Sequence, residues 1–135
     1  MQNIRTLIDQ NLASEVNLPA AGASAVTPVI DTATETPGRL ENIELLVELP
    51  ATASLVEAKD ITLTLKDSAD GETFAALAEV PAIVVTGAAE AAGGGAVASR
   101  FKIPIACRRY LRLDAEVEAA GGDNTDALAS FKFVF

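Results

Sequence analysis

The densest group of side chains that could take part in chemistry lies in the stretch IPIACRRYLRL, residues 103–113. It holds Arg108, Arg109 and Arg112, with Tyr110 between them. Arginine suits phosphates and carboxylates, because its planar guanidinium donates several hydrogen bonds in a fixed arrangement. The stretch therefore suggests three roles: a nucleic-acid site, a catalytic cluster, or a strand that carries its arginines on a surface.

The overall charge argues against nucleic acid. Ten lysine and arginine residues stand against nineteen aspartate and glutamate residues, which gives a formal net charge of −9. Affinity for nucleic acid comes largely from basic side chains that displace counterions from phosphates. We expect no nucleic-acid partner, and an acidic chain of this kind suits contact with other proteins.

No motif indicates an enzyme. The chain has no histidine, the commonest general base and metal ligand near neutral pH. GASAV around Ser24 approaches a nucleophile elbow, but Val26 stands where the second glycine belongs. The glycines of GGGAVASR lack the Gly-Lys-Ser/Thr ending of a phosphate-binding loop. We expect no catalytic residue and no cofactor.

Acidic residues gather in DSADGE, residues 67–72, and in GDNTD, residues 122–126. Their oxygens suit Ca²⁺, but the spacing does not match an EF-hand loop. Asp, Asn and Gly are also the usual residues of turns, because Asx side chains bond to local backbone and Gly accepts positive φ. We therefore predict turns rather than a metal site, with Asp70-Gly71 marking a β-hairpin.

The elements that position these residues are predicted to be strands. From residue 40 onward apolar and polar side chains alternate, which is the period of a strand with one buried face. The predicted inward sets are Ile43, Leu45, Val47 and Leu49; Ile61, Leu63 and Leu65; Phe101, Ile103, Ile105 and Cys107; Leu111, Leu113, Ala115 and Val117; and Leu128, Phe131, Phe133 and Phe135. Cys107, the single cysteine, excludes an internal disulfide and fits a reducing compartment.

The remaining segments complete the architecture. SAVTPVID is predicted to be an edge strand because of Pro28, AIVVTG a buried strand, and GAAEAAGGGAVAS a flexible loop or a long hairpin tip. About seven or eight strands at this spacing, in a chain long enough for one core, predict an all-β fold. We expect a single-domain, jelly-roll-like antiparallel β-sandwich. Residues 1–38 form an N-terminal arm and the first edge strand, and residues 39–135 form the remainder.

The first twelve residues form the predicted arm. Ile4, Leu7 and Ile8 have the spacing of one short amphipathic helical turn, or they belong to an extended segment. Neither is stable alone, so we expect the arm to dock on its own domain or on a partner. The N-terminus lacks the features of a secretory signal, and the most apolar region, residues 74–99, is too interrupted to span a membrane.

Alternation also assigns directions to the arginine stretch. Arg108, Tyr110 and Arg112 are predicted to point outward with Asp114, Glu116 and Glu118. Arg109 shares the inward parity, so it is expected at the strand's start or in the turn, where its guanidinium reaches water or a carboxylate. The outward side chains form either a solvated face with Arg–Glu and Arg–Asp pairs or a protein interface.

The order of the segments LIDQNLAS, ASAVTPVID, LTLKDSADGETF and FKIPIACRRYLRLDAEV resembles the small jelly-roll cement, or decoration, proteins of tailed-bacteriophage capsids. This resemblance implies a non-enzymatic structural virion protein, made in the host cytoplasm, that binds the major capsid protein on the capsid exterior. It also implies a dimer or trimer that stabilises contacts between capsid subunits. The candidate interface residues are Ile4, Leu7, Ile8, Arg108, Tyr110 and Arg112.

SADGETF and RYLRL also resemble parts of discoidin-type carbohydrate-binding sandwiches, which are the alternative. Sugar faces usually stack on exposed aromatic rings, yet the chain has no tryptophan and Tyr110 is its one tyrosine. The phenylalanines at 131, 133 and 135 share one parity and are expected in the core.

Overall fold

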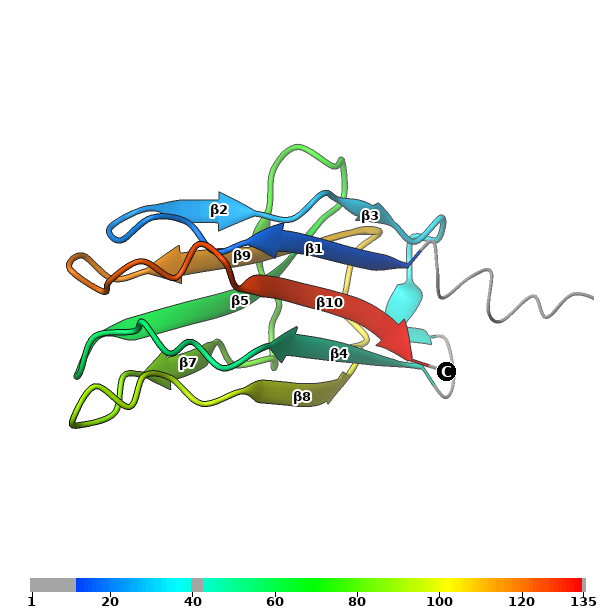
Figure 1. Ribbon diagram of the computed structural model, residues 1–135. Helices are drawn as coiled ribbons and strands as arrows, with labels where there is room; N and C mark the ends of the chain where they lie inside the picture. The colour runs from blue at the N-terminus through cyan, green and yellow to red at the C-terminus, as the bar shows by residue number, and fades with distance from the viewer. Residues whose placement is uncertain (1–11, 40–42, 135) are drawn as a thin grey trace, which may run out of the picture.

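A computed structural model describes residues 12–39 and 43–134. Within these ranges the chain forms ten β-strands and one short 3₁₀ helix, η1 (Pro37–Arg39). The strands make two antiparallel sheets that pack face to face (Figure 1). The all-β sandwich prediction is confirmed. In the described ranges, no helix is long and apolar enough to cross a membrane.

Each sheet draws strands from the whole length of the chain. The first sheet has the order β1-β10-β4-β8, with bounds β1 (Ala13–Asn17), β10 (Leu128–Val134), β4 (Glu44–Leu49) and β8 (Val97–Lys102). The second has the order β2-β9-β5-β6, with β3 also on β9 and β7 also on β5. Its bounds are β2 (Ser24–Val26), β3 (Ile30–Asp31), β9 (Tyr110–Val117), β5 (Asp60–Ser68), β6 (Ala75–Ala76) and β7 (Ile83–Thr86).

The strand order is that of a jelly roll. Because β2 and β3 share one partner strand, and β6 and β7 share another, each pair fills a single strand position. The positions taken in chain order are then 1-8-3-6 in one sheet and 2-7-4-5 in the other. Two interlocking Greek keys produce this winding.

The core lies between the two sheets and follows the predicted alternation. β4, β5 and β9 bury every second side chain, and Leu45, Ile61 and Leu111 have no measurable exposure. Cys107 lies in the same core, as expected. Burial, assisted by the neighbouring Asp67 carboxylate, raises the pKa of the Cys107 thiol to about 12. The thiol is therefore protonated and unreactive near neutral pH.

Three inward assignments are wrong. Ile105 is 74% exposed, because β8 ends at Lys102 and the chain then turns, with the amide of Cys107 donating to the Pro104 carbonyl. Leu128 is 40% exposed, since it lies out of phase with the alternation of the last strand. The expected buried strand AIVVTG is an edge strand, in which Val84 is 54% exposed. Phe135 lies outside the described residues.

The N-terminal region contributes strands to both sheets. β1, which periodicity did not indicate, pairs with β10, and β2 and β3 pair with β9 as the predicted edge strand containing Pro28. The Ser14 hydroxyl donates to the Pro28 carbonyl at 2.8 Å and links the two sheets. Ile4, Leu7 and Ile8 lie outside the described residues, as does all of the predicted arm except Leu12.

Candidate functional site

Arg108 precedes β9 and is bound to the end of β5. Its Nη2 donates to Asp67 Oδ1 at 2.9 Å and to the Asp67 carbonyl at 3.0 Å, while its backbone N–H donates to Asp67 Oδ2 at 2.8 Å. Asp67 shares the inward parity of the β5 core residues and is only 5% exposed. Two of these hydrogen bonds satisfy the buried carboxylate, one at each oxygen, and the third goes to the Asp67 backbone carbonyl. Together they hold the start of β9 against β5.

Arg109 lies immediately before the strand, as predicted, and reaches a carboxylate. Its Nε and Nη2 donate to the two carboxylate oxygens of Asp31 at 2.7 and 2.9 Å, a bidentate pair. These hydrogen bonds raise the pKa of Arg109 and lower that of Asp31. The Arg109 guanidinium lies 5.2 Å from the centroid of the Tyr110 ring.

Arg112 shares a carboxylate with Lys66. Its Nε and Nη2 donate to Asp114 at 2.7 and 3.2 Å, and Lys66 Nζ lies 2.8 Å from the same carboxylate. The guanidinium also covers the ring of Phe74 at 4.3 Å from the centroid. Tyr110, Arg112 and Asp114 alternate with buried residues and so face outward, as predicted.

In these contacts, carboxylates of the same chain neutralise the positive charge of the arginine stretch. Each of its three arginines already binds a carboxylate of the same chain, so a phosphate or an acidic partner would have to replace an existing pair. Tyr110 is also partly covered, because its ring lies 3.6 Å from the Cβ position of Gly71. The geometry favours the ion-paired face over the interface for Arg108, Tyr110 and Arg112.

The hairpin loop beside this face is held by Asp70. Its Oδ1 accepts hydrogen bonds from the backbone N–H groups of Glu72 and Thr73 and from the Ser68 hydroxyl. The bonds from Thr73, Glu72 and Ser68, in that order of size, lower the pKa of Asp70 from 3.8 to about 2. The predicted turn at Asp70-Gly71 is confirmed, with Gly71 at a φ of 80°.

We predict that Asp70→Asn lowers the melting temperature at about pH 7, and that the difference from the original protein shrinks as the pH falls from about 4 towards 2. The folded state keeps this carboxylate ionised below its ordinary pKa of 3.8. Its contribution to stability is therefore complete above that value and is lost as the pH falls through about 2. Calorimetry across this range measures the effect.

Glu72→Gln is the control for this pH series, because it removes an exposed carboxylate from the same loop. A difference between Asp70→Asn and the original protein that is constant from pH 7 to 2 would contradict the predicted ionisation.

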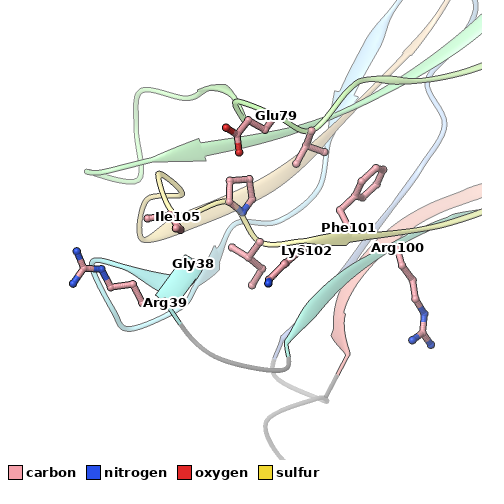
Figure 2. Close-up of a pocket in the computed structure, with 10 residues that line it drawn as sticks. Gly38, Arg39, Glu79, Arg100, Phe101, Lys102 and Ile105 are labelled. Atoms are coloured by element: carbon pink, nitrogen blue, oxygen red, sulfur yellow. The ribbon is translucent and has the colours of Figure 1, made fainter.

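A groove beside the edge strand β8 contains three basic side chains outside the arginine stretch, Arg39, Arg100 and Lys102. It has a volume of about 830 Å³ and is lined by η1, by residues 100–105 and by Glu79 and Val80. Arg39, Lys102 and Arg100 spread along one side of it, and Glu79 lies on the other (Figure 2). Exposed Ile105 lies near its Arg39 end.

The cations of this groove differ from the others in their pairing. Among the described residues, every lysine and arginine except Arg39 and Lys102 has a carboxylate oxygen within 4.0 Å. For Arg100 this contact is close to the 4.0 Å limit, since its Nη1 lies 3.8 Å from Glu44 Oε1. The groove is therefore the place in the described chain where positive charge is least neutralised.

Sequence reasoning did not identify this groove, because its walls are far apart in the chain. They come from η1, from β8 and from the loop that precedes β7, and only the folded topology brings them together. The available signal was the alternation of Arg100 and Lys102 on one face of an expected strand. In the part of the chain that the structure describes, no three His, Cys, Asp or Glu side chains form a group able to hold a metal ion.

The sequence was also compared with protein-family models and with curated proteins. No protein-family model matches the chain, and no curated protein matches it.

Proposed function

We propose that the protein is a structural virion component, a cement or decoration protein that binds the outer surface of a tailed-phage capsid. In this role it contacts the major capsid protein, acts as a dimer or trimer, and stabilises contacts between neighbouring capsid subunits. The observation that carries the proposal is the jelly-roll strand order, because this is the fold that the resemblance of the sequence segments implies.

The distribution of charge supports a binding role of this kind. The outward arginines of β9 are matched within the chain, whereas one groove at the edge of the other sheet keeps weakly paired cations and an exposed isoleucine. A multimer that presents such a surface several times on a repeating shell binds by avidity, even where each contact is weak.

The alternative of a carbohydrate-binding module has less support from the described residues. Tyr110 is packed beside Gly71 and Arg109, and Phe131 and Phe133 are buried in the core. None of these rings is free to stack on a sugar.

Cosedimentation with empty heads tests the proposal. The heads are assembled from a tailed-phage major capsid protein, mixed with the purified protein and separated on a sucrose gradient. We expect saturable binding and a higher temperature of head disruption. A protein that stays at the top of the gradient and binds a ligand on a glycan array instead would overturn the proposal.

A further inference from the structure

We propose that the groove at the C-terminal end of β8, together with the free edge of that strand, binds an extended, acidic segment of a partner protein, which joins the first sheet as an additional strand. The inference rests on the proposed function in one respect: the partner that carries the segment would be the capsid subunit. The binding chemistry itself is argued from the groove alone.

The first step is the free edge of the sheet. β8 is the terminal strand in the order β1-β10-β4-β8 and pairs only with β4, from Val97 to Lys102. One side of its backbone therefore has no strand partner among the described residues. An extended peptide can supply the missing main-chain hydrogen bonds, which is how many domains bind partner segments.

The second step is the alternation along β8. Ala98, Arg100 and Lys102 are exposed on the outer face, while Val97, Ser99 and Phe101 are half-buried on the core side. A strand added beside β8 would place alternate side chains next to these two sets. Carboxylates would meet Arg100 and Lys102, and apolar side chains would cover Phe101.

The third step is the surrounding surface. Arg39 extends the cationic row beyond the end of β8, and Ile105 offers an apolar contact at the same end (Figure 2). The rest of the chain is strongly acidic, because the net charge is −9. Charge complementarity therefore selects an acidic segment for this groove and disfavours a basic one.

The fourth step is that the groove is already formed. η1 packs so closely on the loop after β8 that a Cβ on Gly38 would overlap the carbonyl of Pro104. This contact fixes the position of Arg39 relative to residues 102–105. A preformed site loses less conformational entropy when it binds an extended peptide.

Peptide binding tests the inference without any capsid. The probes are two fluorescein-labelled nine-residue peptides, one alternating Glu and Val and the other alternating Lys and Val. In fluorescence anisotropy at low salt, we expect the glutamate peptide to bind at least about tenfold more tightly than the lysine peptide. In hydrogen exchange, its binding is expected to protect amides of β8.

Charge reversal locates the site. Lys102→Glu and, separately, Arg39→Glu are each expected to weaken binding of the glutamate peptide at least about tenfold. Lys59→Glu is the matched control, since it makes the same change of charge outside the groove, next to the first residue of β5 in the other sheet, and should leave the affinity within about twofold. Two variants are used so that a folding defect in one does not decide the result.

The inference is overturned by equal binding of both peptides, by an equal loss in Lys59→Glu, or by protection confined to other strands. No binding would mean that Arg100 and Lys102 only guard the edge against unwanted pairing, and equally tight binding of a single-stranded oligonucleotide would mean a general anion site. If the peptide binds but empty heads do not, the capsid proposal alone fails. If heads bind the Lys102→Glu and Arg39→Glu variants as well as the original protein, this inference alone fails.

Discussion

Replacing Gly93 with alanine is expected to lower the melting temperature by roughly 8–15 °C, from a loss of about 2–4 kcal/mol in stability. Gly93 has a φ of 74°, a conformation that residues with a side chain adopt at a cost. Its Cβ would also lie 2.5 Å from the carbonyl oxygen of Thr52 and 2.7 Å from the Cα of Ala53. Both effects require the backbone to move.

The size of this effect follows from how the glycine-rich segment is built. The amide of Ala88 donates to the carbonyl of Gly93, and Thr52 and Gly94 exchange two backbone hydrogen bonds, each of 2.9 Å. Gly93 and Gly94 are buried against the loop between β4 and β5. The segment is thus neither of the two predicted forms in full: it is a packed crossover from β7 in one sheet to β8 in the other, and its tip is closed by one antiparallel bridge between Ala88 and Gly93.

Gly95→Ala is the matched control, because it makes the same chemical change two residues away. No atom lies within 4 Å of the Cβ position of Gly95, and its φ is outside the left-handed region. Its melting temperature should therefore stay within about 2 °C of the original. Equal melting temperatures for the Gly93 and Gly95 variants in a thermal scan would contradict the packing of the tip.

Much of the fold could be predicted because its central strands bury one face in the core and expose the other. In β4, β5 and β9 the two-residue period survives in the sequence, since every second side chain must enter the core. The period is absent where strands are short or lie at an edge. β1 contains five residues, of which only Ser14 is buried, so burial leaves almost no apolar signal there.

The candidate site was less predictable, because its contacts join distant segments. The outward direction of Arg112 follows from parity, and so does the placement of Arg109 before the strand. The carboxylate partners of the arginines do not follow from parity, because they are far away in the sequence. Asp31 is 78 positions from Arg109, and Asp67 is 41 positions from Arg108. Only the winding of the jelly roll brings β3 and β5 to the two sides of β9. The same winding assembles the β8 groove.

Deleting residues 1–11 is expected to weaken binding to empty heads at least about hundredfold while leaving the melting temperature within about 2 °C. The prediction rests on the proposed function and on the apolar spacing of Ile4, Leu7 and Ile8. The cut should stop before Leu12, because the Leu12 carbonyl accepts a hydrogen bond from the Phe133 amide at 3.0 Å. Cosedimentation and a thermal scan of the same preparation measure the two effects.

Deleting residues 1–17 is the comparison, because it also removes β1. That strand covers the edge of β10 over five paired positions, from Ala13 opposite Lys132 to Asn17 opposite Leu128. Its loss also removes the Ser14 hydrogen bond between the sheets and uncovers Phe131, so this variant should melt well below the shorter deletion. If the shorter deletion binds heads like the full chain, the arm is not a capsid contact. If it melts as low as the longer one, the arm docks on its own domain.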